Sequence, residues 1–139
     1  MGLELIPLCR MVVELADPMV LTETPVGTRV IVEVKSFTVE GDRLRGRSKG
    51  NAGADWLTIG PDGTGTLDVR ATMETDDGAL VFVYYQGRRD FSEGMDAPLY
   101  TAPKFEAGDE RYRWLNKIQA VGKGDLAGST LTYEIYELR

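Results

Sequence analysis

The chain has 139 residues, with 22 acidic and 16 basic side chains and a formal net charge of −6 at pH 7. This length accommodates one domain around one core, and we expect residues 1–139 to form it. The negative charge disfavours binding to the phosphate backbone of nucleic acids. Because the chain lacks histidine, Ser-His-Asp and Cys-His catalytic sites and histidine-ligated metals are excluded. We therefore expect no metal, no cofactor and no nucleic-acid partner.

The compartment is indicated by cysteine usage and by the apolar runs. Cys9 is the only cysteine, so no disulfide can form within the chain, and an unpaired thiol suits a reducing cytoplasm. The first residues lack the basic and apolar segments of a secretory signal. The densest apolar run, residues 79–85, is far shorter than the roughly 20 residues that span a bilayer. The sequence predicts a cytoplasmic protein with no membrane partner.

Alternating apolar and polar residues dominate the chain, in residues 8–15, 28–35, 66–75 and 131–136. A period of two is typical of half-buried β-strands. Phe37 and Val39 follow one residue out of phase with the preceding valines, which predicts a bulge or bend near residues 35–36. Turn signals occur at residues 61–63 and 76–78, with weaker ones at 40–42 and 122–125. One short helix is predicted over residues 109–115, with Asp109 as N-cap.

About nine short strands joined by turns predict an all-β fold. We expect a single antiparallel up-and-down β-barrel of about 8–10 strands, because closure removes exposed sheet edges. A β-sandwich is the alternative. Residues 80–85 are apolar on both faces, so that strand should be covered on both sides. The barrel interior is one cover, and a loop, the short helix or the second subunit of a homodimer is the other.

Several short motifs follow one another in a fixed order. They are Ala54-Asp55-Trp56-Leu57, Pro61-Asp62-Gly63, Leu67-Asp68-Val69-Arg70-Ala71-Thr72, Thr75-Asp76-Asp77-Gly78-Ala79-Leu80, Pro103-Lys104-Phe105-Glu106, Gly108-Asp109, Arg111-Tyr112 and Trp114-Leu115-Asn116. The series resembles the family called domain of unknown function 3237 and covers nearly the whole chain. The resemblance implies a calycin-like (lipocalin-like) antiparallel barrel and implies little about chemistry. One departure is the segment Lys49-Gly50-Asn51-Ala52-Gly53, where the family often has Pro-Gly-Gly.

The candidate site follows from strand register. If Asp77-Gly78 is a two-residue turn, Arg70 lies opposite Tyr85. If Asp62-Gly63 is also a two-residue turn, Asp55 lies opposite Arg70. Four side chains then share one face of three adjacent strands: Asp55, Asp68, Arg70 and Tyr85. A three-residue loop at the earlier hairpin would instead place Trp56 opposite Asp68.

Two interpretations of this shared face remain open. In the first it faces solvent, and Arg70 joins a ladder of weak surface ion pairs. In the second it faces the barrel lumen, where Arg70 binds a ligand carboxylate or carbonyl. In that case Tyr85 donates a hydrogen bond or a proton, and Asp55 or Asp68 acts as a base. Trp56 either fills the core or stacks against the ligand.

Residues 105–116 form a second candidate region, which we expect to cap the barrel mouth. Its ligand-contact candidates are Glu106, Arg111, Trp114 and Asn116. The alternative is structural: Trp114 plugs the end of the barrel, and Arg111 pairs with Asp109 or Glu106.

Three functions remain compatible with the sequence. The first is a binding protein that holds an unknown small molecule in the lumen around the Arg/Asp/Tyr cluster. The second is a cofactor-free isomerase, cyclase or lyase that uses Asp and Tyr for proton transfer. The third is a structural homodimer with a closed barrel.

Overall fold

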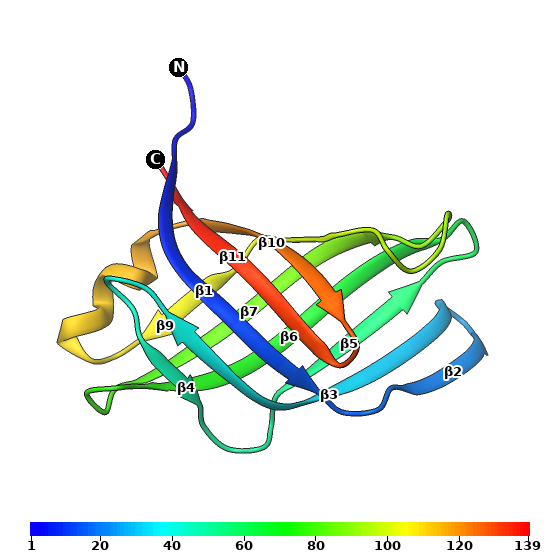
Figure 1. Cartoon of the computed structure of the whole chain (residues 1–139), viewed down its shortest axis with the longest axis horizontal. Coiled ribbons are helices and arrows are strands. Elements are labelled where there is room, and N and C mark those ends of the chain that lie inside the picture. The colour runs from blue at the N-terminus through cyan, green and yellow to red at the C-terminus, as the bar shows by residue number, and fades with distance from the viewer.

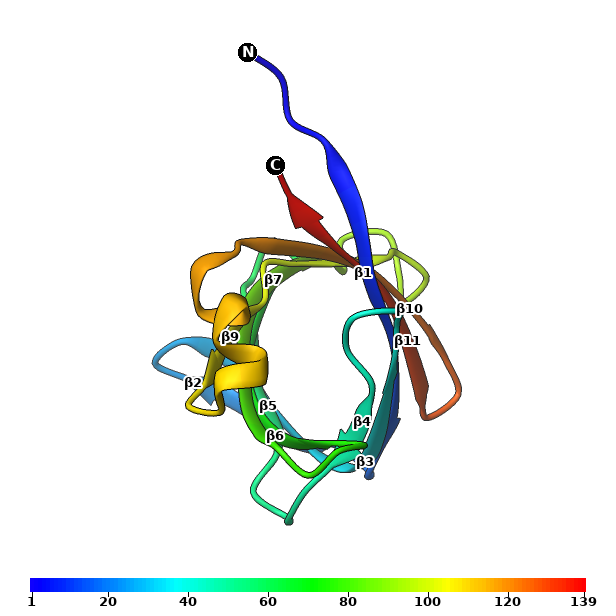
Figure 2. The same ribbon diagram turned by 90° about the vertical axis from the view of Figure 1, so that its left-hand side faces the viewer.

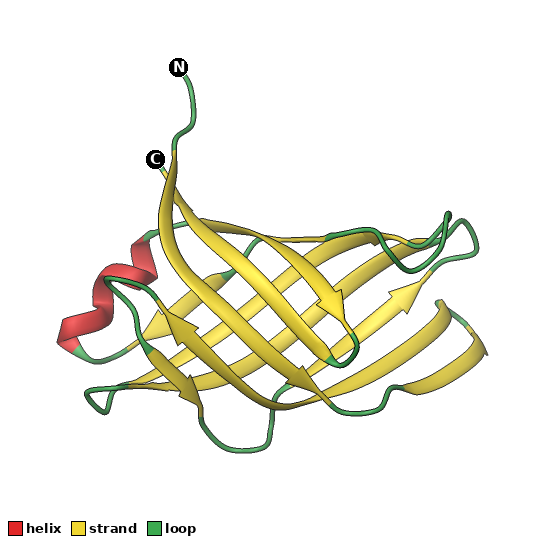
Figure 3. Cartoon of the chain, viewed as in Figure 1, coloured by secondary structure: helices red, strands yellow, loops and turns green.

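The computed structural model describes residues 1–139 and is all-β apart from one short helix (Figure 3). In chain order the elements are β1 (Leu5–Leu15), β2 (Met19–Thr24), β3 (Gly27–Glu40), β4 (Gly46–Ser48), β5 (Ala54–Ile59), β6 (Thr64–Thr75), β7 (Leu80–Asp90), β8 (Leu99–Thr101), β9 (Lys104–Ala107), the 3₁₀ helix η1 (Glu110–Lys117), β10 (Ala120–Ala127) and β11 (Thr130–Leu138). The alternating segments of the sequence are therefore strands, as predicted.

The strands close into a barrel with eight strand positions (Figure 2). The hydrogen-bonded ring runs β3–β1–β11–β10–β8–β7–β6–β5 and returns to β3, with every pair antiparallel. Two positions are split, because β4 and β5 both lie between β3 and β6, and β8 and β9 both pair with β7. The short strand β2 pairs only with β3. The predicted fold class, an antiparallel barrel with one short helix, is confirmed.

The expected bulge lies in the middle of β3. Ser36 pairs with Glu14 of β1, and Val34 pairs with the next residue, Leu15, so Lys35 is an extra residue on β3. This residue shifts the alternation by one, and both Val30 before it and Phe37 after it are buried. The bulge lets one long strand face the core along its whole length.

Both predicted hairpin turns exist, but each has three residues rather than two. Gly63 and Gly78 have φ values of +85° and +92°, the left-handed backbone that closes a three-residue loop. In the later hairpin Val69 pairs with Tyr85, so the predicted pairing of Arg70 with Tyr85 is wrong. The odd loop length is the physical reason, since it moves every pair by one residue and so exchanges the faces.

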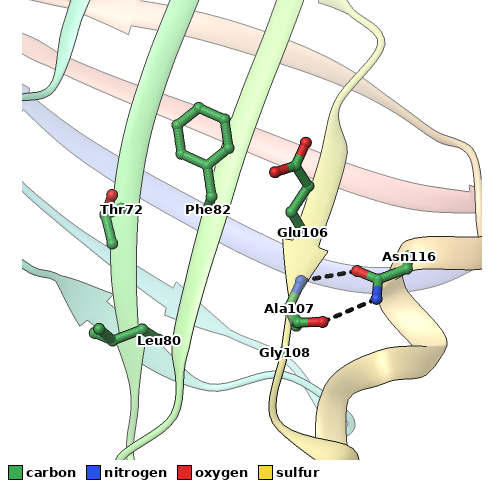
Figure 4. A pocket seen from close by; sticks show the side chains of 7 residues that line it. All are labelled: Thr72, Leu80, Phe82, Glu106, Ala107, Gly108 and Asn116. Atoms are coloured by element: carbon green, nitrogen blue, oxygen red, sulfur yellow. Dashed lines mark hydrogen bonds between the residues drawn. The ribbon is translucent and has the colours of Figure 1, made fainter.

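Helix η1 lies at one end of the barrel (Figure 1), and the sequence predicted its position and cap. The Asp109 carboxylate accepts the backbone N–H of Arg111, which starts the helix. Leu115 is the buried residue of the helix, fully inaccessible to solvent, and it belongs to the main core cluster. The Asn116 side chain exchanges two hydrogen bonds with the backbone of Ala107 in β9, at 2.7 and 2.8 Å (Figure 4). These contacts fix the helix over a packed end of the barrel.

The outer face of β7 is only partly covered. Phe82 and Tyr84 stack with ring centroids 5.4 Å apart and are half-buried, whereas Leu80 is 54% exposed. A second subunit over this face stays a prediction, which a measurement of molecular mass in solution would test. No helix of the structure combines the length and the apolar character needed to cross a membrane.

The weak turn signal at residues 122–125 was misleading, because these residues lie inside β10. Their glycines make room for side chains of neighbouring strands. Gly124 lies opposite Tyr133 of β11, and a Cβ atom there would come within 2.6 Å of the Tyr133 ring.

We therefore expect Gly124→Ala to destabilise the fold by about 1–3 kcal/mol, because the new methyl group overlaps the buried Tyr133 ring, which its hydrogen bond and edge-to-face contact with Tyr85 hold in place. Urea unfolding measures the change. The matched control is Gly108→Ala, where a new Cβ would meet nothing within 4 Å. Equal stability of the two variants would contradict the packing argument.

Candidate functional site

The half of the barrel away from η1 is hollow. A cavity of about 590 Å³ occupies the lumen there, and most of its 25 lining residues are apolar. The mouth is bordered by residues 16–18, by the turn between β10 and β11, and by Phe91 and Met95 of the loop after β7. The closed barrel of the third candidate function is therefore not found in this half. Four residues bring most of the polar chemistry to its wall: Asp55, Tyr85, Arg89 and Tyr133.

Asp55 projects inward from β5. Its Oδ1 atom accepts the backbone N–H of Asp68 at 3.0 Å. Burial raises the pKa of Asp55 from 3.8 to about 6; the negative charge of Asp68 adds to the rise, and the backbone hydrogen bond opposes it. The carboxyl group therefore changes its protonation state close to neutral pH.

Tyr85 of β7 and Tyr133 of β11 meet across the lumen. Their hydroxyl oxygens are 3.2 Å apart and share a hydrogen bond, and their rings pack edge to face with centroids 5.6 Å apart. Burial raises the pKa of both phenols, and the charge of Asp55 raises them further. Both tyrosines are therefore neutral hydrogen-bonding groups at physiological pH.

Arg89 is the buried cation of the cavity, with 7% of its surface exposed. Its Nε donates to the Ala97 carbonyl at 2.9 Å, and its Nη2 donates to the Met95 carbonyl. The guanidinium carbon also lies 5.0 Å from the centroid of the Phe91 ring. Burial lowers the pKa of Arg89, and the charge of Asp96 only partly offsets this. Arg89 thus ties the mouth loop to the barrel wall.

The structure separates the four residues expected to share one face. Asp55 and Tyr85 line the lumen cavity, whereas Arg70 is exposed on the outer face of β6. Asp68 precedes the inward-facing Val69 and so points outward, and it forms no ion pair with Arg70. The lumen interpretation is wrong for Arg70, and so is the surface ladder. Both interpretations fail because the three-residue loops shift the strand pairing by one residue and exchange the faces.

Trp56 also lies on the outer face. The earlier hairpin has the three-residue loop given as its alternative, so Ala54 pairs with Arg70 and Asp55 with Val69. The guanidinium carbon of Arg70 lies 5.2 Å from the centroid of the Trp56 ring. Trp56 therefore neither fills the core nor lines the cavity, and its partner is a surface arginine.

The second candidate region does not lie at the cavity mouth. Glu106 and Asn116 border an open depression on the outer surface near η1 (Figure 4). Arg111 pairs with Asp109 at 2.9 Å and with Asp77 at 3.1 Å, and Trp114 packs under the Arg43 guanidinium at 4.9 Å. None of the four residues lines the lumen cavity, because η1 closes the opposite end of the barrel, and the alternative pairing of Arg111 with Asp109 is confirmed.

Sequence reasoning missed Arg89 and Tyr133. The sequence contained a signal for each of them. Tyr133 alternates with the apolar residues Leu131 and Ile135, and Arg89 lies an even number of residues from Tyr85 on β7, so it shares the same face. No group of three His, Cys, Asp or Glu side chains gathers anywhere in the structure. The chemistry that these four residues offer is hydrogen bonding, ion pairing through Arg89 and proton exchange at Asp55.

Comparison with known proteins identifies the family of the chain. The model of the family described as "Protein of unknown function (DUF3237)" matches residues 3–138. The chain belongs to this family. Among the DUF3237-like relatives, the UPF0311 protein blr7842 of Bradyrhizobium diazoefficiens is 32% identical over 117 residues, which cover 73% of this chain and 74% of the relative. The resemblance seen in the ordered motifs is confirmed.

Solved structures share the DUF3237 barrel. A β-barrel-like protein from Acinetobacter baumannii is 32% identical, with a TM-score of 0.88 over 99% of this chain and 97% of that one. A protein described as an enzyme from Penicillium herquei is 21% identical, with a TM-score of 0.76 over 99% and 94% of the two chains. The latter likeness concerns the fold alone.

Proposed function

We propose that this DUF3237 protein binds a small, mainly apolar molecule in the barrel lumen. The observation that supports this proposal is the open cavity of about 590 Å³ with its mainly apolar wall. Pockets for small molecules are typically about 300–1,000 Å³, apolar, and supplied with a few polar groups that orient the ligand. Burial of the ligand's apolar surface supplies the affinity, and Asp55, Tyr85, Tyr133 and Arg89 supply the orientation.

A substitution that fills the lumen tests the proposal. Val32 of β3 lines the cavity, and Val12 of β1 lies between the inward-facing Met11 and Val13, on the outer face. We expect the wild type to bind the dye 1-anilinonaphthalene-8-sulfonate, whose aromatic rings suit the apolar wall, at one site per chain at pH 7. Val32→Phe should weaken binding at least about tenfold, or about 1.4 kcal/mol, whereas Val12→Phe should leave it unchanged. A fluorescence titration measures both. No binding by the wild type, or equal weakening by both variants, would contradict lumen binding.

A proton-transfer enzyme is the second candidate function, and the state of Asp55 favours it. A carboxyl group whose pKa is about 6 can donate and accept a proton near neutral pH, which is what general acid–base catalysis requires. Tyr85 and Tyr133 beside it would stabilise an enolate or phenolate by hydrogen bonding. An isomerase, cyclase or lyase fits this set, with Asp55 as base and Tyr85 as hydrogen-bond donor. Asp68 has no such role, because its side chain points away from the lumen.

The two functions differ in what Asp55→Asn does. Asparagine keeps the size of Asp55 and an oxygen that can accept the Asp68 N–H, but it cannot exchange a proton. If the protein is an enzyme, turnover of its substrate should fall by roughly 10²–10⁴-fold while binding persists. A panel of keto acids, lactones and phenols, followed by mass spectrometry, supplies the assay. A wild type that binds members of this panel and converts none would restrict the protein to binding.

A further inference from the structure

We propose that Arg89 is the anchor for a carboxylate group, so that the lumen ligand is an apolar molecule carrying a carboxylate. This inference rests on the proposed lumen binding and specifies the ligand class. It assigns the charged contact to β7, at the mouth of the cavity, and not to Arg70, where the sequence pattern had placed it.

The Arg89 guanidinium has no counter-ion in direct contact with it. Arg89 is 7% exposed, yet none of the ion pairs in the structure includes it. Arginine keeps its positive charge even when it is buried. A buried ion without a charged partner is costly, and natural proteins pair such groups or present them to a ligand. The charge of Asp96 acts on Arg89 without forming an ion pair, and a carboxylate in the cavity would provide the direct partner.

The Arg89 guanidinium also keeps hydrogen-bond donors that no group of the protein uses. A guanidinium group has five N–H donors in a planar fork. Two of them engage the carbonyls of Ala97 and Met95, through Nε and Nη2. The two hydrogens of Nη1 and one of Nη2 have no acceptor in the protein. Nη1 therefore keeps both of its hydrogens for a ligand, and a carboxylate oxygen can accept them in charge-assisted hydrogen bonds.

The neighbouring phenol pair offers the ligand a further hydrogen-bond donor. Tyr85 and Tyr133 share one hydrogen bond, and neither hydroxyl makes another bond to the protein. One of the two hydroxyl hydrogens is therefore free to be donated to a ligand. The Arg89 guanidinium is near enough to Tyr133 to oppose the rise in its pKa, and both residues line the cavity. A carboxylate at Arg89 would thus find a second, neutral donor close by.

The test compares two ligands that differ only in the charged group. Isothermal titration at pH 7.5 measures the binding of decanoate and of 1-decanol to the full chain. Because charge-assisted hydrogen bonds are stronger than neutral ones, the wild type should prefer decanoate by roughly ten- to a hundredfold. Arg89→Gln should abolish this preference while it leaves decanol binding within about twofold. Arg70→Gln, on the outer face, is the matched control and should change neither affinity.

The outcomes separate the two proposals. If both ligands bind equally well to the wild type, the carboxylate anchor is wrong and lumen binding stands. If neither ligand binds, lumen binding itself is wrong. Arg89→Lys covers the case in which Arg89→Gln fails to fold, because lysine keeps the charge without the fork. It should retain a reduced preference for decanoate, and an unchanged preference would overturn the assignment of the guanidinium fork.

Discussion

Replacing Asp55 with asparagine is expected to change how the stability of the protein depends on pH. In the unfolded chain this carboxyl ionises near its ordinary pKa of 3.8, and in the folded protein near 6. As the pH rises through this window, the unfolded chain ionises first and is stabilised relative to the folded one. The wild type should therefore lose about 2–3 kcal/mol of stability relative to Asp55→Asn between pH 4 and pH 7. Above pH 7 the difference should stay constant.

Urea unfolding of both proteins across this range measures the effect, because contributions of the other titrating groups cancel in the difference. Asp62→Asn is the informative control. The Asp62 carboxylate accepts the backbone N–H of Thr64, which lowers its pKa, so its contribution has the opposite sign. The wild type should gain stability relative to Asp62→Asn as the pH rises. A flat difference for Asp55→Asn would show that the carboxyl group is well solvated in the lumen.

Replacing Leu115 with alanine is expected to destabilise the protein by about 2–5 kcal/mol. Leu115 is fully buried, and it is the residue through which η1 joins the core. Its truncation removes apolar contacts and leaves a cavity at the packed end of the barrel. Thermal or urea unfolding would report the loss.

Leu80→Ala supplies the matched control, since the same atoms are removed from a side chain that is 54% exposed. Its effect should stay within about 0.5 kcal/mol. Dye binding should survive in Leu115→Ala under conditions where the variant is folded, because η1 does not line the lumen cavity. Loss of binding in the folded variant would show that packing at the η1 end of the barrel is needed to maintain the cavity at the other end.

The sequence predicted the strands and their two faces more reliably than the pairing between strands. Alternation separates Leu67, Val69 and Met73 from the polar set of β6, but it left open which set lines the lumen, and the structure buries the apolar one. The pairing of Arg70 depends instead on whether the turn at residues 76–78 has an even or an odd number of residues. The motif Asp-Asp-Gly is compatible with both, and the left-handed conformation of Gly78 decides the question only in three dimensions.

The candidate site was predicted only in part, because the sequence does not show which side chains the barrel brings together. Asp55 and Tyr85 were singled out and do lie at the cavity, but the charge expected from Arg70 comes from Arg89. What makes a buried arginine tolerable at position 89 is a pair of backbone carbonyls, those of Met95 and Ala97. Backbone acceptors carry no sequence signature. Nor does any pattern reveal that β7 and β11 bring Tyr85 and Tyr133 together across a closed barrel.

Because of the bulge at Lys35, β3 cannot lose or gain a residue without turning part of its side chains to the opposite face. Losing that single residue would restore an unbroken alternation and turn Phe37 and Val39 from the core into water, while Thr38 turned inward. The residues between β4 and β5 carry no such constraint, since most of them are exposed and belong to no strand. Insertions and deletions that accumulate in this chain over evolution should therefore collect around residues 49–53 and spare residues 34–36.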